Sequence, residues 1–126
     1  MKILVVDDEG IVLSSCRRIL EAEGFEVLMA PSVEEALRII DTWVEKSTLL
    51  LLIDVKMPVH NGMYLMQTVK AKWPELSIIV MSGYPTEETI QEAEALGAAT
   101  FIAKPFTPEE LLNTILSVIG KENNHE

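Results

Sequence analysis

Short apolar runs recur along the chain and are separated by longer stretches of mixed polarity. Five runs, several with little polar alternation inside them, occupy residues 3–6, 25–30, 49–53, 78–81 and 99–103. Strands that are covered on both faces of a parallel sheet have this uniformly apolar pattern. The runs therefore predict five buried strands.

The stretches between the runs have a helical pattern. Apolar residues recur there at spacings of three and four in three sets: Val12, Leu13, Cys16, Ile19 and Leu20; Val33, Ala36, Leu37 and Ile40; and Leu111, Leu112, Ile115, Val118 and Ile119. Each set gives a helix one apolar face. The predicted order is (βα)5.

Capping residues mark several of the expected helix boundaries. Ser32 with Glu35 and Thr107 with Glu110 have the spacing of a capping box, which begins a helix. Glycines stand where helices are expected to end, at Gly24, Gly97 and Gly120.

Five βα units joined by right-handed crossovers form an open sheet with helices on both faces. We predict an α/β fold: a flavodoxin-like, doubly wound, five-stranded parallel sheet of order 2-1-3-4-5. Ligands of such sheets bind outside the carboxyl ends of the strands, where the connections diverge. The site is therefore expected beyond the ends of strands 1 and 3.

The 126 residues fit one domain, expected over residues 1–120, followed by a polar tail or the start of a linker at 121–126. The single cysteine, Cys16, excludes an internal disulfide and is expected to be a buried, inert thiol.

The formal net charge of −10 argues against direct contact with nucleic acid or with anionic membrane surfaces. The apolar run near the amino terminus is too short for a signal peptide, and no run approaches the length of a membrane span. We therefore expect a cytoplasmic protein.

Polar side chains with related chemistry follow four of the predicted strands. Asp7 and Asp8 end strand 1, Asp54 ends strand 3, Ser82 ends strand 4 and Lys104 ends strand 5. Two unit charges about 4 Å apart repel by roughly 4 kcal/mol at an effective dielectric near 20, so three converging carboxylates need a cation.

The chemistry of this cluster favours phosphoryl transfer. All obvious ligands are oxygens, which suit a hard ion such as Mg²⁺ and not zinc. A metal with open positions, a carboxylate nucleophile, a lysine and a hydroxyl supply charge neutralisation, an acceptor and donors for phosphoryl oxygens. Asp54 is central and is the natural acceptor. Each residue alone has a simpler explanation as a helix cap, a turn residue or a solvated charge, and only their conjunction indicates a site.

Over essentially its whole length the sequence resembles the bacterial two-component response-regulator receiver domains, which are CheY-like. The resemblance rests on VVDDE at the first strand end, DVKMP with Gly62 following, SGY after strand 4 and FIAKPF around strand 5. It implies that Asp54 is phosphorylated and that Lys104 binds the phosphoryl group. It further implies that Asp8 and Asp54 bind Mg²⁺ directly, that Asp7 acts largely through water, and that the backbone carbonyl of Lys56 is another ligand.

The resemblance also implies a conformational switch. Ser82 would turn its hydroxyl toward the phosphoryl group, and the rotamer of Phe101 would report that shift. Helix 4, strand 5 and helix 5 would form the output face, which could also pair two copies. A cis peptide between Lys104 and Pro105 is usual in the family, and the small trans preference of X-Pro bonds permits it. We further hypothesise that Lys56 and Tyr84 set the lifetime of the phosphorylated state.

The expected function is therefore a signalling switch that is phosphorylated by a sensor histidine kinase or a phosphotransfer protein, without turnover of an independent substrate. One alternative is a Mg²⁺-dependent phosphohydrolase resembling the haloacid-dehalogenase phosphatases, but these carry a second acid where this chain has Lys56. Another is a flavodoxin-like electron carrier, whose phosphate loop would be repelled by Asp7, Asp8 and Glu9.

Overall fold

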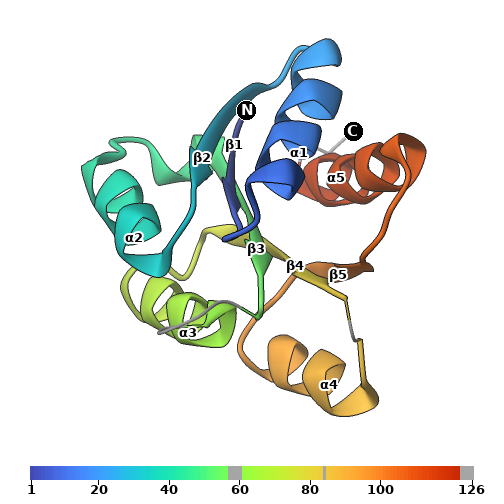
Figure 1. Ribbon diagram of the computed structural model, residues 1–126. Coiled ribbons are helices and arrows are strands. Elements are labelled where there is room, and N and C mark those ends of the chain that lie inside the picture. Colours follow the sequence, from blue (N-terminus) through green and yellow to red (C-terminus); the bar gives the residue numbers. More distant parts are fainter. Residues whose placement is uncertain (57–60, 84, 123–126) are drawn as a thin grey trace.

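A computed structural model of the chain describes residues 1–56, 61–83 and 85–122. Strands and helices alternate along it, as the apolar pattern predicts (Figure 1). The strands are β1 (Lys2–Val6), β2 (Glu26–Ala30), β3 (Leu49–Asp54), β4 (Ser77–Ser82) and β5 (Thr100–Ala103). The α-helices are α1 (Gly10–Ala22), α2 (Val33–Thr42), α3 (Gly62–Lys72), α4 (Glu87–Ala95) and α5 (Pro108–Glu122), and a short 3₁₀ helix, η1, spans Lys46–Thr48.

All strand pairs are parallel, and the sheet has the order β2-β1-β3-β4-β5. This confirms the predicted (βα)5 doubly wound fold. β1 and β3 are neighbours at the centre, so the chain reverses its direction of winding there. The carboxyl ends of these two strands therefore flank the crevice that such a reversal leaves.

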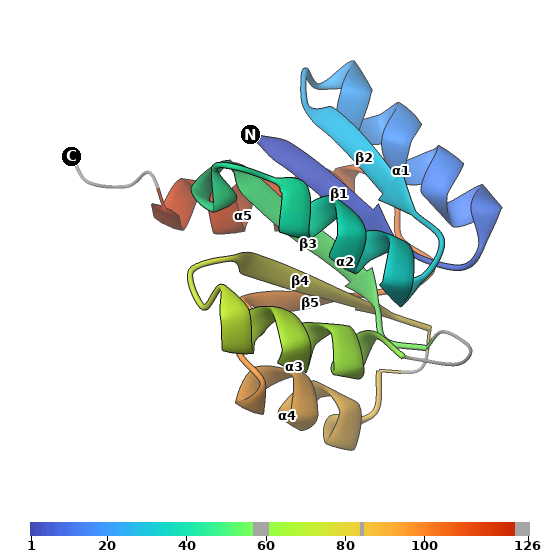
Figure 2. The ribbon, with the colours of Figure 1, turned by 90° about the vertical axis from the view of Figure 1, so that its left-hand side faces the viewer.

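Alternate residues of each strand enter two separate cores, one on each face of the sheet. In β3, Leu51 and Ile53 belong to the core beneath α2 and α3, whereas Leu50 and Leu52 belong to the core beneath α1 and α5. Figure 2 shows α2, α3 and α4 on one side of the sheet. Because both faces are covered, all six residues of β3 are buried, which explains why the five before Asp54 are all apolar.

Local capping chemistry fixes several helix ends. In the box before α5, the Glu110 N–H donates to Thr107 Oγ1 at 3.1 Å and the Thr107 N–H donates to Glu110 Oε1 at 2.8 Å. Ser32 accepts from the Glu35 N–H at 3.2 Å. Gly24 and Gly97 have φ values of +91° and +102°, the left-handed conformation that ends a helix most easily at glycine.

The expectation that Gly120 ends a helix is wrong, because α5 continues through it to Glu122. Gly120 is exposed, and a Cβ there would meet no atom within 4 Å, so the helix passes through the glycine without a packing constraint.

Cys16 is fully buried on the inner side of α1, as expected. Its burial, with a smaller contribution from the negative charge of Asp7, raises the pKa of the thiol to about 12. Such a thiol stays protonated and unreactive at neutral pH. Within the described residues, no helix combines the length and apolarity that crossing a bilayer requires.

Candidate phosphorylation site

The parallel register brings four polar residues to one edge of the sheet. Asp54 is the last residue of β3 and lies opposite Met81, one residue before Ser82 ends β4. The β4–β5 pairing continues past the strand ends, where the Lys104 N–H donates to the Ser82 carbonyl at 2.8 Å. Asp7 follows β1, and its N–H donates to the Ala30 carbonyl of β2 at 3.1 Å. Extended backbone therefore holds each of these residues in place.

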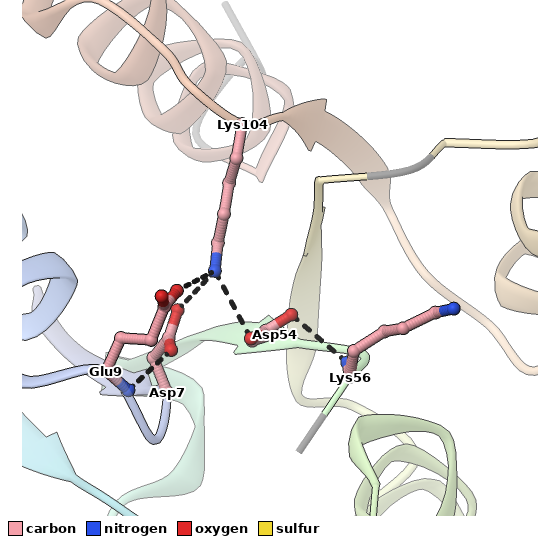
Figure 3. A network of polar contacts seen from close by, with 5 residues as sticks. All are labelled: Asp7, Glu9, Asp54, Lys56 and Lys104. Atoms are coloured by element: carbon pink, nitrogen blue, oxygen red, sulfur yellow. Dashed lines mark hydrogen bonds and ion pairs between the residues drawn. The ribbon is translucent and has the colours of Figure 1, made fainter.

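The ammonium group of Lys104 lies at the centre of the site (Figure 3). Its Nζ is 2.7 Å from Asp7 Oδ2, 3.2 Å from Asp54 Oδ2 and 3.3 Å from Glu9 Oε1. The side chains of Asp7 and Asp54 are almost completely buried, with 0% and 5% exposed, and that of Lys104 is 14% exposed. One buried cation therefore serves three carboxylates, which leaves the cluster with an excess of negative charge.

Backbone amides hold the other oxygens of the two buried aspartates. Asp7 Oδ1 accepts from the Glu9 N–H at 2.9 Å, an Asx-type turn in which the side chain bonds two residues ahead. Asp54 Oδ1 accepts from the Lys56 N–H at 3.1 Å in the same manner. The side chain of Lys56 extends away from the cluster (Figure 3). Each carboxylate is thus oriented by its own strand end before any ligand binds.

The carboxylates that gather here are Asp7, Glu9 and Asp54, whose oxygens lie within 4.8 Å of one another. Asp8 was expected in this group, but its side chain is exposed and the group does not include it. The chain bends at Asp8 just beyond β1, which leaves Asp7 buried, Asp8 exposed, and Glu9 largely exposed but with its carboxylate reaching back to Lys104. Asp8 as a direct metal ligand stays a prediction. Glu9 was not assigned a role from the sequence, although its spacing of two from Asp7 was a signal for it.

Burial and charge shift the pKa of both central groups. Burial is the largest influence on Asp54 and raises the pKa of its carboxyl, helped by the charge of Asp7, while the Lys56 N–H and Lys104 act in the opposite direction. For Lys104, burial lowers the pKa, but the ion pair with Asp7 and the negative charge of Asp54 outweigh burial and raise the pKa above its ordinary value. The site therefore holds a charged lysine beside a carboxylate that is reluctant to ionise.

The raised pKa of Asp54 predicts how replacing it with asparagine changes stability with pH. A carboxyl with a raised folded-state pKa stabilises the fold below the unfolded value of 3.8, and this stabilisation is lost as pH rises through the folded pKa. Without metal, Asp54→Asn should therefore gain stability relative to wild type at pH 7, and less so near pH 4. Urea unfolding in a chelator measures this, with Asp41→Asn, at an exposed position, as the charge-matched control. A gain that grows as pH falls would contradict the prediction.

The donor set of the site fits a divalent cation. Among the described residues, Asp7 Oδ2 is completely buried without a hydrogen-bond partner, and its 2.7 Å contact with Lys104 Nζ is an ion pair. A buried carboxylate oxygen with a vacant lone pair is an unusual feature that calls for a ligand. Together with two neighbouring carboxylates it forms an all-oxygen set, which Mg²⁺ prefers. The residues present thus could hold this ion.

Gly62, the first residue of α3, lies directly behind Asp54. Its N–H donates to the Val55 carbonyl at 3.1 Å. A Cβ on Gly62 would lie 2.2 Å from the Asp54 carbonyl oxygen and 2.8 Å from both Ile53 Cγ2 and Val55 Cα. Only glycine permits α3 to begin this close to the strand that carries Asp54.

The remaining predicted residues have definite places near the site. Ser82 is fully buried at the end of β4. Phe101, in the middle of β5, is half-buried and packs against the core on the α2 and α3 face. The Lys104–Pro105 peptide bond is cis, as the resemblance suggested. Tyr84 lies outside the described residues.

Comparison with known proteins identifies the family that the sequence motifs resemble. The response regulator receiver domain profile matches residues 3–116. Among curated relatives, the sporulation initiation phosphotransferase F of Bacillus subtilis is 28% identical over 98% of this chain and 97% of its own. The hydrogenase transcriptional regulatory protein HoxA of Cupriavidus necator is 33% identical over 93% of this chain, which spans only 24% of that longer protein.

A solved structure agrees with these sequence relatives. The receiver domain protein from Methanospirillum hungatei JF-1, described as CheY-like, superposes with a TM-score of 0.89 and 32% identity over 97% of this chain and 95% of its own. The names of these proteins are those of a transcriptional regulatory protein, a phosphotransferase and a response regulator receiver domain protein. The chain belongs to the response regulator receiver domain family.

Proposed function

We propose that this domain is a phosphorylation-dependent switch that accepts a phosphoryl group on Asp54 from a sensor histidine kinase or a phosphotransfer protein. The observation that carries the proposal is the position of Asp54. It is a buried carboxylate at the centre of the carboxyl edge of the sheet, and it shares the Lys104 ammonium with Asp7. A second buried carboxylate on the same cation does not stabilise the folded state, so a purely structural role for Asp54 does not account for the pair.

The proposed reaction is a nucleophilic displacement at phosphorus. A carboxylate oxygen of Asp54 forms a bond to the phosphorus of the donor, and the bond from phosphorus to the donor's histidine nitrogen breaks with its electrons moving to that nitrogen. The Lys56 N–H orients one oxygen of Asp54, and Lys104 lies beside the other. After transfer, Lys104 is placed to bind a phosphoryl oxygen in exchange for the carboxylate.

Asp7, Asp8, Asp54 and the backbone carbonyl of Lys56 are the residues that we propose hold Mg²⁺. When bound, the ion supplies positive charge against the phosphoryl oxygens as negative charge gathers there. Asp7 contributes the buried oxygen that has no hydrogen bond, and Asp54 contributes the nucleophile itself. The two buried carboxylates therefore attract the cation and orient the acceptor at once.

A hollow beside the site offers a place for the donor protein. It has a volume of about 410 Å³ and lies between the start of α1 and the segment after β5, with Lys104 and Gly83 on its walls. Its apolar walls include Ile11, which is 77% exposed, and Phe106. An apolar hollow that contains the phosphoryl-binding lysine lets a docked partner bring its phosphohistidine to Asp54.

The proposed output involves Ser82, Phe101 and the face formed by α4, β5 and α5. Ser82 turns toward the phosphoryl group, and Phe101 changes rotamer in response. A cavity of about 130 Å³ between α4 and β5 is lined in part by Phe101, Ala93 and Ala98, so side chains there have room to rearrange. The changed face would bind a downstream partner or a second copy of the chain. We assign residues 1–122 to this domain, because α5 continues to Glu122, two residues beyond the boundary predicted at 120.

Acetyl phosphate tests the proposal, because it is a small donor that needs no partner protein. With Mg²⁺, intact-mass measurement should show one added phosphoryl group on the wild type and none on Asp54→Asn. Excess chelator should abolish the addition. Equal labelling of the two proteins, or labelling that is unaffected by the chelator, would count against the proposal.

A further inference from the structure

Glu9 is the one charged residue in the cluster to which the proposed function gives no role. We infer that Glu9 determines phosphodonor specificity. Its carboxylate shares Lys104 with the acceptor, Asp54, and lies at the entrance of the site, where it slows phosphorylation by the more negatively charged donors. The inference rests on the proposed function, since it concerns the rate at which Asp54 is phosphorylated.

The position of Glu9 is that of a residue at the entrance. Its side chain is 59% exposed, whereas the other members of the cluster are almost entirely buried. Its Oε1 is nevertheless 3.3 Å from Lys104 Nζ and belongs to the group of carboxylate oxygens within 4.8 Å of one another (Figure 3). A donor that approaches Asp54 from solvent therefore passes close to this carboxylate.

The fold does not require the carboxylate of Glu9. Glu9 precedes α1 as its N-cap residue, but its side chain makes no capping hydrogen bond. The hydrogen bonds that Glu9 contributes to the turn and to the start of α1 come from its backbone. Its carbonyl accepts from the N–H groups of Val12 and Leu13, and its N–H donates to Asp7 Oδ1. An uncharged side chain of the same shape therefore leaves these bonds in place. The carboxylate itself contacts Lys104, at 3.3 Å, so removing its charge acts on the site and not on the start of α1.

The negative charge of Glu9 opposes an incoming phosphoryl group in two ways. It competes for Lys104, the cation that the phosphoryl oxygens must also reach, and it repels the donor directly. Both effects grow with the charge of the donor. They also fall with ionic strength, because the Debye length is only about 8 Å at physiological salt and the carboxylate is exposed.

Two small donors of different charge measure this discrimination. Acetyl phosphate carries about two negative charges at neutral pH, and phosphoramidate, which transfers its phosphoryl group with release of ammonia, carries about one net. Glu9→Gln should raise the second-order rate constant for acetyl phosphate about fivefold, the order expected from a unit charge about 5 Å from a doubly charged group in water with salt screening. The gain for phosphoramidate should be about twofold, and added salt should shrink both.

Two further variants and one binding measurement make the experiment specific. Glu9→Asp keeps the charge and should resemble the wild type. Glu23→Gln removes one exposed charge beyond the far end of α1 and should change neither rate. Rates are compared at Mg²⁺ saturating for each variant. Calorimetric titration with Mg²⁺ should show weaker binding to Glu9→Gln by a few fold, opposite in direction to the faster phosphorylation.

Failure of this inference is distinguishable from failure of the proposed function. If neither donor labels the wild type at Asp54, the proposed function fails. If the wild type is labelled and Glu9→Gln leaves the ratio of the two rate constants unchanged, or slows both, only the specificity role of Glu9 is overturned. An equal change in Glu23→Gln would likewise overturn it, because net charge would then explain the effect.

Discussion

Replacing Lys104 with methionine is expected to lower the free energy of unfolding by about 3 kcal/mol when no divalent metal is present, because it leaves buried carboxylates without their cation. Asp7 and Asp54 are almost completely buried, and Lys104 is their shared counter-ion at 2.7 and 3.2 Å. Saturating Mg²⁺ should restore part of the loss. It should also bind the variant more tightly than the wild type, because a competing positive charge has gone. Urea unfolding with and without Mg²⁺ measures both effects.

Two control variants separate the loss of this buried counter-ion from the general effect of removing a positive charge. Arg17→Met removes a cation from an exposed i,i+4 pair with Glu21, and such pairs contribute about 0.3 to 0.5 kcal/mol. Adding Asp7→Asn to Lys104→Met should recover stability, since one of the uncompensated charges is then absent. The account is contradicted if Lys104→Met is no more destabilising than Arg17→Met, or if the second substitution makes it worse.

Gly62→Ala is expected to lower the free energy of unfolding by about 2 to 4 kcal/mol, in the range of severe overpacking. The added Cβ would lie 2.2 Å from the Asp54 carbonyl oxygen, and backbone atoms cannot rotate away as a flexible side chain can. Either α3 or the end of β3 has to move. Because Asp54 is at that strand end, the phosphorylation rate should also fall, and a displacement of about 1 Å is enough for a loss on the order of a hundredfold.

Gly10→Ala is the matched control for this prediction. Gly10 is also the first residue of a helix, α1, but a Cβ there would meet nothing within 4 Å. The control should unfold within about 0.5 kcal/mol of the wild type, as substitutions away from packed features do. Thermal unfolding and the acetyl phosphate rate compare the two variants directly. Equal stability of Gly62→Ala and Gly10→Ala would show that the close approach behind Asp54 is not a constraint.

The strands and their order could be predicted because both faces of the sheet are covered. Burial on both faces makes each strand a nearly continuous apolar run, and the observed bounds of β1 and β3 differ by one residue from the apolar runs that predict them. Parallel strands also end at the same edge, so a polar residue just after each run is expected at a common site. That reasoning anticipated the meeting of Asp7, Asp54 and Lys104, although they are far apart in sequence.

The parts that the sequence did not predict depend on side-chain direction and on close approach. Asp7 and Asp8 are the same residue type and adjacent in sequence. Only the turn after β1 buries Asp7 and exposes Asp8 to solvent. The same turn brings Glu9 back toward Lys104. Position 62 requires glycine because the backbone at the end of β3 lies against the start of α3. The two segments meet only in the folded chain. Local pattern carries no information about such contacts.

In the proposed switch, the arrangement of charge lets one domain be stable and also respond to phosphorylation. Lys104 holds Asp7 and Asp54 together, yet its contacts are the ones that the phosphoryl group is proposed to replace. A single modification at Asp54 therefore changes the partner of the lysine that joins β5 to β1 and β3. Such an exchange of partners at the sheet edge is a direct route from chemistry to the output face.

Reductive trapping of the phosphorylated protein identifies the residue that accepts the phosphoryl group. Borohydride converts an aspartyl phosphate to homoserine, and peptide mass spectrometry then identifies the modified position. After treatment with acetyl phosphate and Mg²⁺, we expect homoserine at position 54 in the wild type and at no position in Asp54→Asn. Homoserine at Asp7 or Asp8 in the wild type, or a phosphoryl group that resists both borohydride and hydroxylamine, would contradict it.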